Sequence, residues 1–117
     1  MKSFSFPKHL RLRKRNEFAF LSKKGRGFAG EKLVCQWMRT ESPYVRLGLT
    51  VSGKTGSAVE RNLFKRRVRE AFRICPLKTR NGIDLNVRPQ KTLKTSFQEI
   101  LLFFNQIEKY LFGVPQK

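Results

Sequence analysis

The sequence contains few of the groups that enzymes use for catalysis or metal binding. Its 117 residues include eight acidic side chains, of which Asp84 is the only aspartate, together with one histidine, His9, and two cysteines, Cys35 and Cys75. One histidine and two isolated cysteines do not make a plausible four-ligand zinc site. The scattered carboxylates offer no clear pair for general acid–base or metal-assisted hydrolysis. We therefore predict no catalytic residue and no metal site, and we expect both cysteines to be buried or half-buried apolar side chains.

Long apolar runs are also missing. No stretch approaches the ~20 residues that span a bilayer, and the cationic first 15 residues are not followed by the apolar segment of a secretory signal. These absences predict a cytoplasmic protein with no membrane partner. In a reducing cytosol a disulfide between the two cysteines is not expected.

Negative charge is scarce, and positive charge is abundant. The chain has 26 Lys and Arg against 8 Asp and Glu, a formal net charge of +18. Like charges repel in a compact fold, so a bound polyanion would recover free energy. Nucleic acid is the commonest such partner, because each neutralised phosphate also releases a condensed counterion. Hydrophobic residues still make up 39% of the chain, which is too many for a disordered basic tail.

Length and hydrophobic patterning predict a single α+β domain over residues 1–117, with residues 1–10 as an extended or mobile N-terminal segment. Ser-x-x-Glu capping boxes at Ser57 and Ser96 mark the starts of two helices. A turn at 40–43 separates two strands and predicts that they form an antiparallel hairpin. The expected elements are helices over 14–24, 57–75 and from 96 onward, and strands over 32–39, 45–52 and 83–88.

The helix over 57–75 combines an apolar face with a cationic one. At about 100° per residue, its apolar residues share one side: Phe64, Val68, Ala71, Phe72 and Cys75. An adjoining stripe carries an amide and four cations: Asn62, Lys65, Arg66, Arg69 and Arg73. Like charges one turn apart repel, and a merely solvated face normally mixes charge signs. We therefore favour a phosphate-binding face over a solvated one.

The basic helix and the strand before it resemble a known signature. The pattern is Arg-Leu-Gly-Leu-Thr-Val-Ser at 46–52, then Lys54 and Gly56, then Arg-Asn-x-x-Lys-Arg-x-x-Arg-Glu at 61–70. It resembles the bacterial ribonuclease P protein component. The likeness extends more weakly to residues 12–25 and to the last helix.

The resemblance implies both a fold and a function. The fold would be an α/β sandwich, a mainly antiparallel sheet packed by helices, with a left-handed βαβ crossover at the basic helix. The protein would be a cofactor of ribonuclease P that binds the catalytic RNA subunit and the 5′ leader of precursor tRNA. That RNA would use Mg²⁺, held mainly by RNA, to remove the leader endonucleolytically and give the mature tRNA 5′ end. The protein alone would not cleave, and no protein partner would be required.

The resemblance also implies site residues. The residues that match the family's RNA-contacting helix and the loop before it are Arg61, Asn62, Lys65, Arg66, Arg69, Ser52 and Lys54, and helical spacing adds Arg73. Phe18 matches an aromatic of the leader cleft, and Gln36 and Trp37 are further candidates on the strand over 32–39. For Trp37 we prefer a core position, because both faces of that strand are apolar. The chain departs from the family at Gly53, commonly basic, and at Ser22 and Gln36, commonly aromatic.

Three other functions are compatible with some of these features. A ribosomal or general RNA-binding protein would share the net charge, but the spaced signature favours the ribonuclease P hypothesis. A self-sufficient nuclease would need carboxylates or a general base that the sequence does not group together. A helix-turn-helix DNA reader is disfavoured because strands, and not helices, flank the basic helix.

Overall fold

A computed structural model of the chain describes residues 10–12, 14–90 and 92–113. Its elements follow in the order α1 (Arg15–Lys24), β1 (Arg26–Ala29), β2 (Leu33–Arg39), β3 (Val45–Leu49), η2 (Gly53–Thr55), α2 (Ala58–Ile74), η3 (Pro76–Thr79), β4 (Ile83–Pro89) and α3 (Phe97–Phe112). The two η elements are single turns of 3₁₀ helix. The structure thus confirms the three predicted helices and the three predicted strands, and adds β1.

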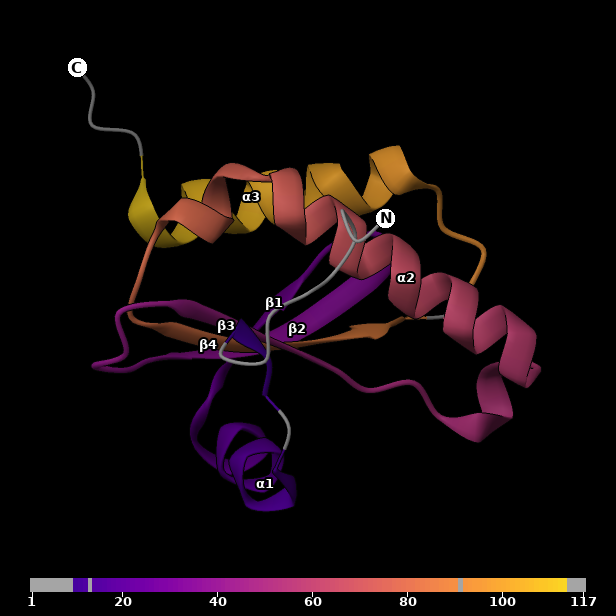
Figure 1. Cartoon of the computed structure of the whole chain (residues 1–117), viewed down its shortest axis with the longest axis horizontal. Coiled ribbons are helices and arrows are strands. Elements are labelled where there is room, and N and C mark those ends of the chain that lie inside the picture. Colours follow the sequence, from indigo (N-terminus) through magenta and orange to yellow (C-terminus); the bar gives the residue numbers. More distant parts are fainter. Residues whose placement is uncertain (1–9, 13, 91, 114–117) are drawn as a thin grey trace.

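The elements form three layers (Figure 1). Helices α2 and α3 lie side by side on one face of the sheet, and α1 lies on the other face. The main core fills the space between the sheet and the pair α2–α3, where the rings of Phe72 and Phe104 meet edge to face at 5.5 Å. The predicted α+β sandwich is confirmed.

The sheet order β1-β2-β4-β3 contradicts the predicted hairpin. Strands β2 and β3 are not neighbours, because β4 lies between them, antiparallel to β2 and parallel to β3. All of Ile83–Val87 in β4 is buried. An inner position, where both faces of the strand are covered, removes the most apolar surface of β4 from water. The parallel pair β3–β4 is connected through α2, which makes a βαβ crossover. Its left-handed sense stays a prediction.

Strand boundaries differ from the predicted ones at two places. β3 ends at Leu49, where the chain turns away toward η2. β1 was not predicted, because only Phe28 of its four residues is partly buried and the strand shows no alternation. Before α1, Arg11 forms a parallel bridge to Leu47, and both Leu10 and Leu12 are buried. Of the predicted extended segment over 1–10, the structure describes Leu10 alone, which is buried, and residues 1–9 lie outside the described part of the chain.

Both predicted capping boxes are present. The Ser57 hydroxyl accepts a hydrogen bond from the Glu60 amide at 3.1 Å, and the Glu60 carboxylate accepts one from the Ser57 amide at 2.8 Å. Ser96 and Glu99 repeat the arrangement at 3.1 and 2.8 Å. Each box satisfies amides that the first helical turn leaves without partners.

Candidate nucleic-acid interface

The cationic stripe of α2 lies outside the core, next to the apolar face that anchors the helix. The five residues predicted to be buried, Phe64, Val68, Ala71, Phe72 and Cys75, are each at most 3% exposed. Asn62 and Arg66 are exposed, while Arg61, Lys65, Arg69 and Arg73 are half-buried along the same helix. We call Arg61, Asn62, Lys65, Arg66, Arg69 and Arg73 the α2 stripe.

Three cations of the stripe carry positive charge that the described residues do not neutralise. Within the described residues, Lys65, Arg66 and Arg69 form no ion pair with a carboxylate. Burial, together with the nearby charge of Arg11, lowers the pKa of Arg69. Both effects disfavour the charged guanidinium, and a bound anion would reverse them. The stripe therefore presents a favourable position for a phosphate group.

A hollow adjoins the stripe at the β3 edge of the sheet. It has a volume of about 290 Å³ and is lined by Arg11, Leu12, Phe18, Leu47, Leu49, Lys65 and Arg69. We call it the Phe18 cleft. Three cations and one aromatic ring meet there, from the N-terminal segment, α1 and α2. That combination suits single-stranded RNA, whose phosphates need cations and whose bases stack on aromatic rings.

Gly48 allows Phe18 to lie close to the sheet. A Cβ atom built on Gly48 would lie 2.6 Å from the Phe18 ring and 3.1 Å from Leu12 Cβ. Any larger residue at 48 would therefore displace the ring from the cleft.

An ion-pair network attaches α1 to the sheet beside the cleft. Arg46 donates two hydrogen bonds to the Asp84 carboxylate, at 3.0 and 2.8 Å, and a third to Glu17 of α1 at 3.0 Å. These partners, Asp84 foremost, raise the pKa of Arg46. Removing Arg46 would leave Asp84 buried without its cation, an arrangement that is strongly destabilising. The network thus holds the helix that carries Phe18.

The structure places two of the three predicted leader-cleft residues on the same side of the sheet, and only Phe18 lines the cleft. Phe18 and Gln36 lie on the α1 side of the sheet, where the Gln36 amide donates to the Ser22 carbonyl at 3.2 Å. Trp37 points to the opposite face, because successive residues of a strand alternate. It is 7% exposed in the main core, with Tyr110 against its ring edge at 6.1 Å. Its preferred core position is confirmed, and the structure separates it from Phe18 and Gln36.

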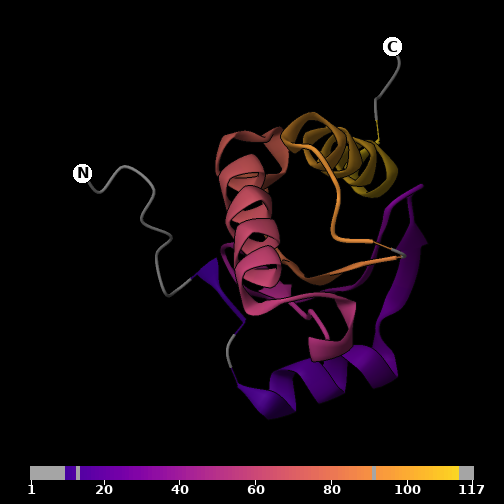
Figure 2. The same cartoon turned by 90° about the vertical axis from the view of Figure 1, so that its right-hand side faces the viewer.

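The loop residues Ser52 and Lys54 lie at η2, beneath the start of α2 (Figure 2). Both are exposed, and the Ser52 hydroxyl accepts a hydrogen bond from the Lys54 amide at 3.1 Å. A Cβ atom placed on Gly53, between them, would have no neighbour within 4 Å. The glycine therefore leaves open space at the position where the resemblance led us to expect a basic residue.

Arg11 is a candidate site residue that the sequence analysis missed. It lines the Phe18 cleft beside Arg69, although it lies far from α2 in the sequence. The alternation of Leu10, Arg11 and Leu12 is a weak strand signal that could have indicated it.

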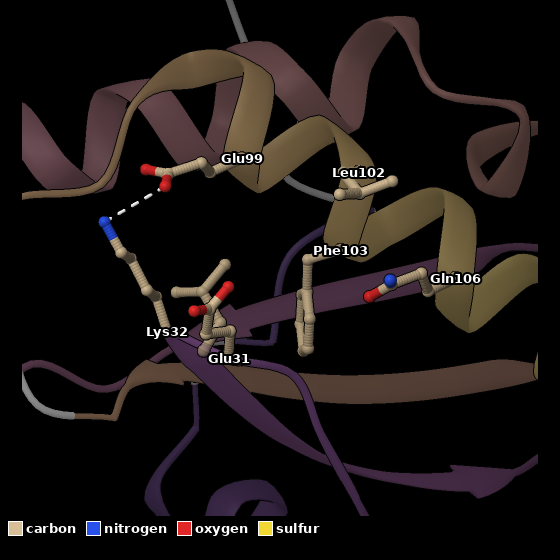
Figure 3. A pocket seen from close by; sticks show the side chains of 7 residues that line it. Glu31, Lys32, Glu99, Leu102, Phe103 and Gln106 are labelled. Atoms are coloured by element: carbon tan, nitrogen blue, oxygen red, sulfur yellow. Dashed lines mark ion pairs between the residues drawn. The ribbon is translucent and has the colours of Figure 1, made fainter.

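A smaller hollow of about 90 Å³ lies between α3 and the β1–β2 turn (Figure 3). Lys32 and Glu99 close one side of it with an ion pair of 3.0 Å. Hydrogen bonding from the Ser96 backbone, and then Lys32, lowers the pKa of Glu99. Since its charges already pair with each other, this hollow offers little attraction to a polyanion.

Both cysteines are free and buried, as predicted. Burial raises the pKa of the Cys35 thiol to about 12, so it stays protonated at neutral pH. The described part of the chain contains no group of three His, Cys, Asp or Glu placed to hold a metal ion. Among the same residues, no helix has the length and apolar character needed to cross a membrane.

Comparisons with known proteins agree with this arrangement. The family model described as Ribonuclease P matches residues 6–111. The ribonuclease P protein component of Desulfatibacillum aliphaticivorans is 38% identical over 91 residues, which cover 78% of this chain and 77% of that protein. That of Desulforapulum autotrophicum is 40% identical over 91 residues and covers 78% of each chain.

Solved structures give the same result. The ribonuclease P protein of Thermotoga maritima superposes with a TM-score of 0.73 at 32% identity, over 86% of this chain and 96% of that one. The Staphylococcus aureus protein gives a TM-score of 0.74 at 28% identity, over 86% and 94% of the two chains. These matches support the ribonuclease P hypothesis and not the ribosomal or general RNA-binding alternative. The chain therefore belongs to the family of ribonuclease P protein subunits.

Proposed function

We propose that this subunit binds the ribonuclease P RNA with the α2 stripe and the 5′ leader of precursor tRNA in the Phe18 cleft. The observation that carries the proposal is the uncompensated positive charge of Lys65 and Arg69, which border both surfaces. Phosphates bound there would neutralise the stripe and release counterions. Bases of a single strand would stack on Phe18, a contact worth ~1–3 kcal/mol per base and tolerant of leader sequence.

We further propose that the RNA subunit performs the cleavage, with Mg²⁺ held by RNA phosphates. The described carboxylates that lie near the cleft already have partners: Glu17 and Asp84 bind Arg46. Glu60 is engaged in the capping box of α2. Because these residues do not form a metal-ligand set, no step of the reaction is assigned to a metal on the protein. A Mg²⁺ ion prefers phosphate oxygens and water, both of which RNA supplies. We place this function in the cytoplasm.

Cleavage of a precursor tRNA at low Mg²⁺ tests the proposal. Three reactions are compared: a bacterial ribonuclease P RNA alone, this protein alone, and the two together. We expect efficient leader removal only when both are present, because the protein supplies binding and the RNA supplies chemistry. Cleavage by the protein alone would contradict the assignment of catalysis to RNA. Tight RNA binding without stimulation would contradict the cofactor role.

A further inference from the structure

A second cationic hollow lies at the opposite edge of the sheet from the Phe18 cleft. Strand β2 extends past the end of β1 there. The pairing of the two strands ends with Arg26 and Trp37, and Met38 and Arg39 of β2 have no partner on β1. The hollow has a volume of about 410 Å³ and is lined by Lys24, Arg26, Trp37, Met38 and Arg39. We call it the Lys24 groove. All three charged residues that line it are cations.

Two of these cations form no ion pair among the described residues, and the third is held in place. Lys24 and Arg26 are exposed, and neither forms an ion pair with any carboxylate in the described ranges. The Arg39 guanidinium lies 5.7 Å from the centre of the Trp37 ring and donates a hydrogen bond to the Leu111 carbonyl at 3.1 Å. The three cations together favour an anionic ligand, and the guanidinium of Arg39 is already ordered, so little ordering cost remains for that residue on binding.

The groove continues along α1 toward an exposed aromatic ring. Met38 also lines a neighbouring hollow of about 380 Å³, together with Asn16, Glu17, Phe20, Leu21, Arg46 and Asp84. Phe20 is 52% exposed there, so its ring is open to stacking. The carboxylates of Glu17 and Asp84 would repel an anion, but Arg46 already binds both. The path therefore offers a stacking surface at one end and cations at the other.

Helix α1 connects this path to the Phe18 cleft. It passes beneath the sheet from the side of the N-terminal segment to the side of β1 (Figure 2). Phe18 lines the first cleft and Lys24 lines the second groove, six residues later. At 1.5 Å per residue this separation is about 9 Å along the helix axis. Six residues also rotate the side chain by about 600°, so Phe18 and Lys24 project from different sides of α1, and a single strand that contacts both surfaces must pass around the helix.

We infer that the Lys24 groove binds the upstream part of the precursor tRNA leader, after the leader has left the Phe18 cleft. This inference rests on the proposed function, because it extends the same bound strand. Phosphates of the strand would contact Lys24, Arg26 and Arg39, and a base would stack on Phe20. The leader is favoured over the RNA subunit as the occupant because α1 contributes a residue to both surfaces, Phe18 to the cleft and Lys24 to the groove, whereas no residue of the α2 stripe lines the groove.

Leader length separates this contact from other RNA contacts. The dissociation constant of the holoenzyme is measured for two precursor tRNAs, with leaders of about 4 and about 16 nucleotides, the span of strand lengths that single-strand binding folds cover. The test variant is Lys24→Ala/Arg26→Ala. The control variant is Lys23→Ala/Lys109→Ala, which removes the same charge at exposed positions that do not line the groove.

We expect the test variant to bind the long-leader substrate about three- to tenfold more weakly and the short-leader substrate unchanged. The slope of log K against log salt concentration should become less steep by about 1.4 for the long leader, because two phosphate contacts are lost and each contributes about 0.7 on a single strand. Phe20→Ser should weaken binding of the long leader alone, and Phe20→Tyr should restore it. The control variant should match the wild type. Circular dichroism confirms that each variant folds.

Three results would overturn the inference. The first is an unchanged affinity for the long leader, and the second is an equal loss for both leaders, which would place the contact on the tRNA body or the RNA subunit. The third is an equal loss of affinity in the control variant, which would show that the effect comes from the lower net charge of the protein and not from a contact in the groove. The proposed function is read separately, from stimulation of cleavage by the wild-type protein on the short-leader substrate.

Discussion

Helices α2 and α3 share their local design and differ in their outer surfaces. They span 17 and 16 residues, begin with the same Ser-x-x-Glu capping box, and lie side by side on one face of the sheet. The outer surface of α3 carries Lys109 with Glu99 and Glu108. α2 instead has two glutamates, Glu60 and Glu70, against six cations: Arg61, Lys65, Arg66, Arg67, Arg69 and Arg73.

The difference lies in where each helix finds charge partners. The α3 carboxylates pair within the protein, Glu99 with Lys32 and Glu108 with Arg80, at 3.0 and 2.6 Å. Lys65, Arg66 and Arg69 of α2 have no such partner among the described residues. A shared apolar face therefore explains why both helices fold onto the sheet. The uncompensated outer charge distinguishes the helix that we propose binds RNA.

The largest effect should come from the buried face of α3. Phe104 is fully buried against Phe72, so Phe104→Ala should lower the free energy of unfolding by about 3–5 kcal/mol, from lost transfer and a new cavity. Urea denaturation measures this change. Leu102→Ala, at a 56% exposed position of the same helix, is the control and should change stability by less than about 0.5 kcal/mol. Equal costs for the two variants would show that α3 is not packed as described.

A smaller effect, on binding and not on stability, should come from the outer face of α2. Arg66→Ala should weaken binding to ribonuclease P RNA by about 1.5–3 kcal/mol, if a charged hydrogen bond to phosphate is lost, and should reduce the salt slope by about one contact. Lys109→Ala on α3 removes one charge from an exposed position and should change neither quantity. Titrations over a salt series measure both. Unchanged affinity and slope for Arg66→Ala would exclude this residue from the RNA contact.

The smallest effect should come from the caps, and it should be the same for both helices. Ser57→Ala and Ser96→Ala each remove the hydroxyl that accepts from the third helical amide, so each should cost about 1 kcal/mol of stability. Thermal or urea unfolding of the two variants tests this equality. Ser57→Thr and Ser96→Thr retain the hydroxyl and serve as controls. A large difference between the two alanine variants would show that the helices do not depend on their caps to the same degree.

Local patterns predicted α2 well, because a helix is specified by neighbours a few residues apart. The five apolar positions are buried, Ser57 and Glu60 form the box, and the stripe lies beside the apolar face as the projection indicated. Burial of the cysteines and the core position of Trp37 followed from the same kind of pattern. The predicted pairing of β2 with β3 was wrong, because the partner of a strand is decided by contacts between residues far apart in the sequence.

The amino-acid sequence by itself determined the charge, the amphipathic helices, their caps and the signature that identified the family. Those properties depend on composition and on periodicities of a few residues. Only the tertiary structure decided that β4 lies between β2 and β3, that Arg46 joins Asp84 to Glu17, and that Arg11 and Arg69 line the same hollow. Arg46 forms hydrogen bonds with residues 29 and more positions away, and Arg11 lines the same hollow as Arg69 although the two are far apart in the sequence. These arrangements depend on which packing buries the most apolar surface and gives a buried carboxylate such as Asp84 its cation, and no local pattern encodes that balance.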